Sequence, residues 1–152
     1  MTARAVIVSL QILFAAAWPG SGALADTGLS ISNPWIREAP PASQVHAGYM
    51  SLANRTQLPV TITAISSKDY SAAEIHRSWI EDGVARMEAL QQLVVQPGDS
   101  LELAPGGYHL MLFNPVRSLQ AGDSVTIRLE TADGNCHTIE APVRRATPET
   151  EH

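Results

Sequence analysis

Residues 106–115 read GGYHLMLFNP, and this stretch decides how the chain folds. If it is a β-strand, Leu110 and Leu112 point to one side, whereas His109 and Met111 point to the other. A strand in a small domain usually needs only one apolar face, so the histidine and the methionine are free to hold a common ligand. The ordinary interpretation is a methionine that lines the core beside a half-exposed histidine, and this stretch alone favours it.

The rest of the chain repeats the pattern of short strands and turns. Runs of β-branched and apolar residues alternate with turn signals built from ten prolines and ten glycines, and no long segment with a period of 3.6 residues is present. This pattern predicts an all-β sandwich or barrel. The expected strands are residues 29–36, 47–54, 60–66, 73–80, 84–90, 100–103, 108–113, 124–131 and 137–143.

Two Asp-Gly pairs predict tight hairpin turns. Asp82–Gly83 and Asp133–Gly134 each supply a glycine, which accepts the positive φ that a two-residue turn requires. Counting back from the first turn places Met87 opposite Ser78 on the preceding strand. His76 and Met87 are then diagonal neighbours on one face of the sheet, within reach of long side chains.

The start of the chain reads as an export signal. Residues 5–18 are almost entirely apolar, a positive charge precedes them, and residues 23–25 form an A-x-A cleavage site. We expect residues 1–25 to be a cleaved signal peptide, with an uncleaved membrane anchor as the alternative. Residues 26–146 then form one domain and 147–152 a short polar tail. No later segment is apolar enough to cross a bilayer, so we expect no stable membrane insertion after cleavage.

Composition argues against several classes of protein. The formal net charge is −5 and the basic residues are scattered, so nothing indicates binding to nucleic acid or to an anionic membrane surface. The single cysteine, Cys136, cannot form an intramolecular disulfide. No context typical of a catalytic nucleophile, such as G-x-S-x-G, is present. We therefore expect a binding and transfer protein rather than an enzyme.

The candidate ligands are His76, Met87, His109 and Met111, two imidazoles and two thioethers. Thioether sulfur is soft and neutral, so it favours Cu(I) over hard cations such as Mg²⁺ or Ca²⁺. A zinc site more often recruits thiolates or carboxylates. Thioethers also persist better than free thiols in the oxidising compartments that exported proteins reach. The set therefore indicates a Cu(I) site.

The spacing of these four residues resembles a known family. They match the H-x10-M-x21-H-x-M signature of the periplasmic copper chaperones called PCuAC. The resemblance spans about residues 29–143, nearly all of the chain after the expected signal peptide. Further segments that look like the family are NPWIR at 33–37, GYMSLAN at 48–54, EDGV at 81–84 and LAPGGYHLM at 103–111.

Membership of this family implies a cupredoxin-like Greek-key β-sandwich or barrel that holds one Cu(I) with His76, Met87, His109 and Met111. It also implies a periplasmic location and delivery of copper to a cuproprotein, notably the CuA centre of cytochrome c oxidase subunit II, or to another copper chaperone. The chain departs from many relatives, because no methionine closely follows His76 and the tail offers only His152 as a further ligand. We therefore expect a single copper site.

Two alternative functions stay open at this point. Cys136 and His137 suggest the first alternative, a cupredoxin-like electron-transfer protein. The blue-copper site of such a protein uses a cysteine, two histidines and a weak axial methionine. Such sites usually place a histidine and a methionine shortly after the cysteine, whereas here no methionine follows and the next histidine is His152. The other alternative is an exported adhesion or assembly module on which the four side chains are incidental.

Four residues outside the candidate site carry expectations of their own. Met50 and Trp35 are expected in the core, Met50 because a flexible thioether fills irregular gaps. His46 follows a proline-rich loop and is expected at the surface. Trp79 falls on the strand face opposite His76, so we expect it to pack away from the site.

Overall fold

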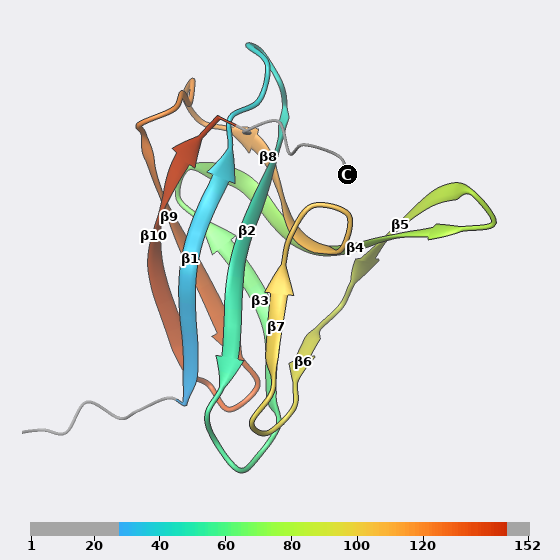
Figure 1. Cartoon of the computed structure of the whole chain (residues 1–152). Coiled ribbons are helices and arrows are strands. Elements are labelled where there is room, and N and C mark those ends of the chain that lie inside the picture. Colours follow the sequence, from blue (N-terminus) through green and yellow to red (C-terminus); the bar gives the residue numbers. More distant parts are fainter. Residues whose placement is uncertain (1–27, 146–152) are drawn as a thin grey trace, which may run out of the picture.

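The computed structural model describes residues 28–145, which form ten β-strands and no helix (Figure 1). The all-β class predicted from the sequence is therefore confirmed. Residues 28–145 therefore include no helix that is long and apolar enough to cross a membrane. The strands are β1 Leu29–Arg37, β2 Val45–Asn54, β3 Val60–Ser67, β4 Tyr70–Glu81, β5 Val84–Leu90, β6 Leu93–Val95, β7 Ser100–Leu103, β8 Tyr108–Pro115, β9 Ser124–Thr131 and β10 Cys136–Arg144.

The strands form one continuous sheet in the order β5-β4-β8-β7-β2-β1-β10-β9-β3-β6, and β2 also pairs with β8. The ladder folds over where β1 and β10 run parallel, with Ile36 beside Val143. The strands from β5 to β1 form one layer, here called the front layer, and those from β10 to β6 form the second layer. In Figure 1, β1 and β2 lie in front of β3 and β9. The result is an open β-sandwich.

A single hydrophobic core fills the space between the two layers. Leu110 and Leu112 of β8 are 0% exposed, as the alternation in their strand predicts. Met50 of β2 is 1% exposed, which confirms its predicted place in the core. The other layer contributes Ile127 and Leu129 from β9, which are also buried. Burial of these side chains is the main term that stabilises such a fold.

The predicted strands are all present, and one further strand was not predicted. β6 has only three residues, of which Leu93 and Val95 are buried and pair with Ile62 and Val60 of β3. Three residues are too few to show a period of two, so the alternation gave no sign of this strand.

The Asp82–Gly83 turn is confirmed as a two-residue turn. Both residues have a positive φ, 51° for Asp82 and 76° for Gly83. The register that follows from this turn places Met87 opposite Ser78, as predicted. Turn chemistry and strand alternation together therefore set the pairing of β4 with β5.

The prediction of a two-residue turn at Asp133–Gly134 is wrong, because this loop has three residues. The Gly134 N–H donates to the Thr131 carbonyl over 2.9 Å, and the Thr131 N–H donates to the Asn135 carbonyl over 3.0 Å. In this loop Gly134 alone has a positive φ, of 85°. These features define a type I turn followed by a left-handed residue, a common three-residue hairpin. An Asp-Gly pair is compatible with both turns.

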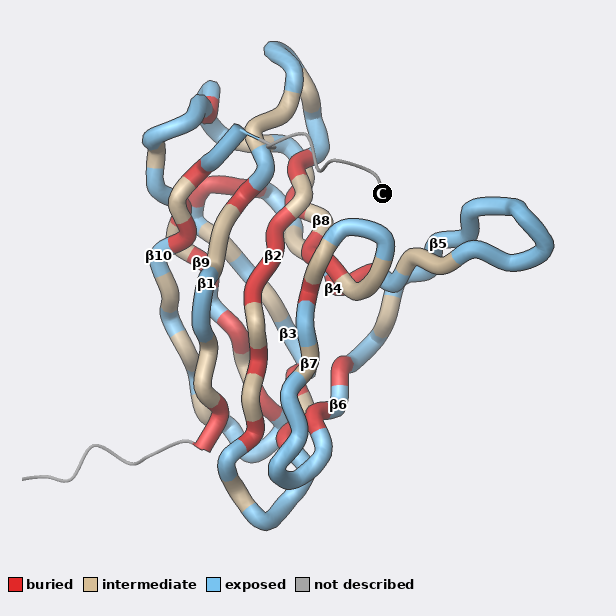
Figure 2. Tube along the Cα trace, in the orientation of Figure 1, coloured by how far each residue is buried: buried red, intermediate tan, exposed pale blue. Residues whose placement is uncertain are grey.

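One hairpin projects from the sandwich (Figure 1). β4 pairs with β8 as far as Arg77 and Tyr108, and beyond that point it pairs only with β5. We call residues 78–87 the hairpin arm. Its residues are exposed or half-exposed, shown in pale blue and tan in Figure 2. Apart from the hydrogen bond that the Ser78 N–H donates to the Gly107 carbonyl over 3.0 Å, the arm is held by its own ladder and turn rather than by the core.

The expected signal peptide, residues 1–25, and the expected tail, residues 147–152, lie outside the described residues. The boundaries of the domain at 26 and 146 therefore stay predictions.

Candidate metal centre

Two imidazoles face each other on neighbouring strands of the front layer. His76 on β4 and His109 on β8 are register partners, and their ring centroids are 5.9 Å apart. Each residue is only 9% exposed. The sequence predicted that His76 lies near Met87 and that His109 lies near Met111. It did not predict the pairing of β4 with β8, which joins the two groups into one.

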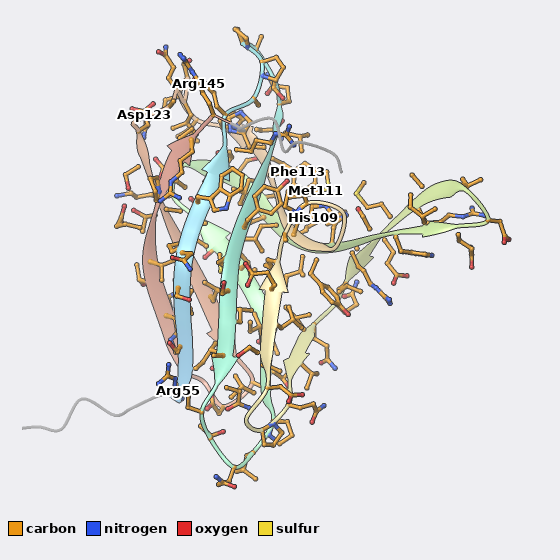
Figure 3. The ribbon with its side chains drawn as sticks, in the orientation of Figure 1. Arg55, His109, Met111, Phe113, Asp123 and Arg145 are labelled. Atoms are coloured by element: carbon orange, nitrogen blue, oxygen red, sulfur yellow. The ribbon has the colours of Figure 1, made fainter. Side chains whose placement is uncertain are left out.

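Met111 lies on the same strand face as His109, two residues further along β8. Its register partners are Glu74 on β4 and Ala47 on β2, and its side chain is half-buried. Phe113 continues the row, with its ring 6.5 Å from the ring of His76. Figure 3 shows His109, Met111 and Phe113 following one another along β8. The row combines an imidazole, a thioether and an apolar aromatic wall.

Met87 is the fourth predicted ligand, and it lies on the hairpin arm. It is opposite Ser78 and diagonal to His76, on the face that His76 occupies. Met87 is 55% exposed, far more than either histidine. Three candidate ligands are thus held in the body of the sandwich, and the fourth is carried on a projecting hairpin.

Hydrogen bonds determine which nitrogen of each imidazole carries the proton. His109 Nδ1 lies 3.0 Å from the Gly107 carbonyl, which can only accept, so Nδ1 is the donor and Nε2 keeps its lone pair. His76 Nε2 lies 2.8 Å from a carboxylate oxygen of Glu74, so here Nε2 is the donor. The Nδ1 of His76 is buried and has no hydrogen-bond partner among the described residues. Each ring therefore keeps one unprotonated nitrogen whose lone pair can bind a metal ion.

The centre has no cluster of hard ligands. Among residues 28–145, no three His, Cys, Asp or Glu side chains are grouped in a way that could hold a metal ion. The donors gathered on this face are two imidazoles and thioether sulfur, a soft and neutral set. Its chemistry fits a soft monovalent ion better than a hard divalent one.

Cys136 does not join this group. It is exposed, begins β10 and pairs with Glu130 of β9. β10 belongs to the second layer, whereas both histidines are on strands of the first. The cysteine is therefore a surface residue.

His46 is buried rather than exposed, which corrects the expectation from the sequence. β2 begins at Val45 and places His46 opposite Leu112 on the core-facing side, where His46 is 5% exposed. Its Nδ1 lies 2.8 Å from the Tyr70 hydroxyl. Burial lowers the pKa of His46 and so favours the neutral imidazole. The even spacing of His46 from the buried Met50 was the signal that could have revealed this.

The two tryptophans among residues 28–145 lie outside the core. Trp35 is half-buried and packs on the ring of Tyr49 at a centroid distance of 4.7 Å, so its predicted place in the core is wrong. Ile36, the next residue, takes the core position and is fully buried. Trp79 lies on the face of the arm opposite His76, as expected, and the guanidinium of Arg77 lies 5.7 Å from the centre of its ring.

Comparison with known proteins supports this description of the fold. Residues 29–143 match the family model described as LpqE-like. The lipoprotein-type protein Lxx21020 of Leifsonia xyli subsp. xyli is 28% identical over 118 residues, which cover 77% of this chain and 70% of the relative.

Two solved structures have the same cupredoxin-like fold, which confirms that prediction. The copper-bound PCuAC domain from PmoF2 superposes with a TM-score of 0.67 at 20% identity, over 78% of this chain and 94% of that domain. The Cu(I) form of DR1885 from Deinococcus radiodurans gives a TM-score of 0.62 at 25% identity, over 83% of each chain. Since the family model covers most of the chain, the protein belongs to the LpqE-like family, which corresponds to the PCuAC family.

Proposed function

We propose that this protein is a copper chaperone that binds one Cu(I) through His76, Met87, His109 and Met111. The observation that carries the proposal is the pair of facing imidazoles, 5.9 Å apart, with a thioether next along the same strand face. The relatives support it, because the solved structures include a copper-bound PCuAC domain and a Cu(I) form of DR1885. Soft thioethers beside imidazoles select Cu(I).

The hydrogen bonds assign a donor atom to each histidine. His109 would bind copper through Nε2 and His76 through Nδ1, since the other nitrogen of each ring donates to Gly107 or Glu74. A partner of this kind fixes the orientation of an imidazole and raises its basicity, as carboxylates do in other metal sites. Glu74 and the Gly107 carbonyl would therefore hold the two rings ready for the ion.

Transfer follows from the placement of the ligands. Bare Cu(I) need never enter water if the ligands of a recipient replace those of the chaperone one at a time. Thioethers are weaker donors than imidazoles, and Met87 is the most exposed of the four residues. We expect Met87 to leave first, while the two histidines in the body keep hold of the ion until the recipient is engaged.

The place of action would be the periplasm. The expected signal peptide at residues 1–25 and the lipoprotein-type relative both support an exported, envelope-associated protein. The recipient would be a cuproprotein, with the CuA centre of cytochrome c oxidase subunit II as the first candidate and another copper chaperone as the second. The role is binding and transfer rather than catalysis.

Competition with a Cu(I) chelator tests the site, and reconstitution of copper-free oxidase subunit II tests the delivery. We expect one Cu(I) per chain, bound far more tightly than Zn²⁺, and a CuA spectrum after incubation of the loaded protein with the apo subunit. A zinc affinity equal to the Cu(I) affinity would exclude the proposed site. Tight Cu(I) binding without transfer to subunit II would leave the site standing and point to another recipient.

The position of Cys136 weighs against an electron-transfer cupredoxin. A blue-copper site needs the cysteine sulfur beside the histidines, and Cys136 lies on the other layer. Colour separates the two functions. The proposed Cu(I) site is colourless, whereas a Cu(II)–thiolate site absorbs strongly in the visible range.

A further inference from the structure

β5 is the outermost strand of the front layer, and its outer edge pairs with no other strand among residues 28–145. Six of its seven residues are exposed, including Val84 and Met87, which are large and apolar. A long, exposed edge strand presents unpaired backbone groups that another strand can use. Natural proteins usually protect such an edge, so this one calls for a partner.

The two faces of β5 differ in charge. Ala85, Met87 and Ala89 alternate along the face that also carries His76, and none of them is charged. Arg86 and Glu88 lie on the opposite face. The strand therefore has one neutral face and one face on which a positive and a negative residue stand two positions apart.

The hairpin turn determines which backbone groups point outward. In a two-residue hairpin the residues that flank the turn, here Glu81 and Val84, form a hydrogen-bonded pair, and the pairs then alternate. The even-numbered residues of β5 therefore bond to β4. The N–H and C=O groups of Ala85, Met87 and Ala89 point to the free edge.

We propose that the free edge of β5 pairs antiparallel with β5 of a second copy of this chain, around a two-fold axis at Met87. Only residues whose N–H and C=O groups point outward can form hydrogen-bonded pairs across the edge. Ala85, Met87 and Ala89 must therefore lie opposite members of the same set in the partner subunit. The register centred on Met87 joins Met87 to Met87 of the partner subunit and Ala85 to Ala89 of the partner subunit. The two hairpins then form one four-stranded sheet.

Charge selects this register over its neighbours. With Met87 at the centre, Arg86 lies opposite Glu88 of the partner subunit, and Glu88 lies opposite Arg86 of the partner subunit. If the partner strand shifts by two residues in one direction, Arg86 lies opposite Arg86 of the partner subunit. If it shifts by two residues in the other direction, Glu88 lies opposite Glu88 of the partner subunit. Opposite charges across strands stabilise a pair and like charges destabilise it. Val84 also gains an apolar partner, Leu90 of the partner subunit.

The dimer would bring two thioethers together. Register partners in a hydrogen-bonded antiparallel pair have Cα atoms about 5.5 Å apart and side chains on the same face. Met87 and Met87 of the partner subunit would then lie side by side on the face that carries His76. This consequence rests on the proposed function: each copper site would gain a neighbouring sulfur through which copy-to-copy exchange could pass.

Sedimentation equilibrium of the copper-free protein tests the pairing. We expect the mass to rise from monomer to dimer with concentration. Arg86→Glu places a glutamate opposite Glu88 of the partner subunit at both ends, and we expect the dissociation constant to rise by about tenfold or more. The double variant Arg86→Glu/Glu88→Arg restores opposite charges and should restore the dimer. Both variants lose the 3.4 Å ion pair between Arg86 and Glu81 of the same chain, so rescue identifies the contact between subunits.

Ala85→Pro is the second variant. It removes only an N–H that points to the free edge, so the β4–β5 ladder stays intact while the edge pairing is lost. We expect a monomer that still binds one Cu(I). A wild-type protein that stays monomeric at every concentration, or a dimer that neither the charge reversal nor Ala85→Pro weakens, would overturn the proposal. Failure of the monomer and of the wild type to bind Cu(I) would instead count against the proposed function alone.

Discussion

β8 and β5 both carry proposed copper ligands, but different parts of the structure hold them in place. β8 has strands on both sides, β4 and β2, and its Leu110 and Leu112 are fully buried. β5 has one neighbour, and six of its seven residues are exposed. The packing of the core therefore fixes the position of His109, whereas the position of Met87 is fixed only by the β4–β5 ladder and its turn.

The difference teaches how one site can bind and release. A donor fixed by the core loses little conformational freedom when the ion binds, so it contributes most of its interaction energy to affinity. A donor on the arm must be ordered at that moment, and it can withdraw without disturbing the core. Rigid histidines and a movable methionine together suit a protein that must hold copper and then pass it on.

The largest effect should come from the core face of β8. Leu110→Ala and Leu112→Ala each remove a fully buried side chain, and we expect the copper-free protein to lose roughly 2–5 kcal/mol of unfolding free energy. Urea denaturation measures the change. Ile80→Ala on the arm is the matched control, because Ile80 is 71% exposed and should change stability by only about 0.5 kcal/mol or less. Equal losses in body and arm would remove the distinction between them.

The second effect concerns the other face of the same strand. We expect His109→Ala to weaken Cu(I) binding by roughly 100-fold or more, since the loss of an outer-shell partner alone costs about 10–100-fold in other metal sites. The rise in melting temperature on addition of copper should shrink in proportion, because a ligand stabilises only the state that binds it. Chelator competition and thermal unfolding measure the two quantities. A variant that keeps the full copper-induced rise would show that His109 is an ordinary residue of an apolar face.

Local patterns explain what the sequence could predict. The alternation in residues 108–113 predicted which side chains of β8 are buried, and the Asp82–Gly83 turn predicted the position of Met87 beside β4. Both depend on residues close in sequence. The resemblance to PCuAC grouped the four proposed ligands before any geometry was known, because a family signature carries information that one sequence does not display.

Non-local contacts explain what the sequence could not predict. The pairing of His76 with His109 joins strands more than thirty residues apart, and no periodicity encodes it. The burial of His46 is also non-local, since β2 pairs with β8 and the His46 ring lies against the Tyr70 hydroxyl of β4. Trp35 was misplaced because a large apolar residue can pack on another ring outside the core, as Trp35 does on Tyr49.

The third prediction compares the two thioethers directly. Met111→Ile and Met87→Ile each keep apolar bulk and remove sulfur, so both should weaken Cu(I) binding by an amount on the order of tenfold, or about 1.4 kcal/mol. The loss should be larger for Met111, because the body holds this donor in place before the ion arrives. The copper-free stability should change by less than about 1.5 kcal/mol in both variants.

Met50→Ile is the control for this pair. Met50 is 1% exposed in the core, so its replacement should leave copper binding unchanged. If Met87→Ile binds copper as well as the wild type while Met111→Ile does not, the arm contributes no ligand and the ion is held by the body alone. If Met111→Ile is unfolded without copper but keeps its affinity when folded, Met111 is a packing residue of β8 and not a ligand.

The smallest effect concerns the buried histidine of the body. Burial holds the pKa of His46 below its usual value, so as pH falls through about 6.5 the unfolded chain takes up a proton that the folded protein resists. The contribution of His46 therefore makes the folded state less stable between pH 7 and pH 5 and has no effect at higher pH, where both states are neutral. His46→Gln keeps a polar group near the Tyr70 hydroxyl and cannot titrate. We expect the copper-free variant to lose less stability than the wild type over this range, measured as the difference in urea midpoint between pH 7 and pH 5. Parallel losses in the two proteins would mean that His46 takes up its proton equally well when folded, and that the body is more open to water at this point than its 5% exposure indicates.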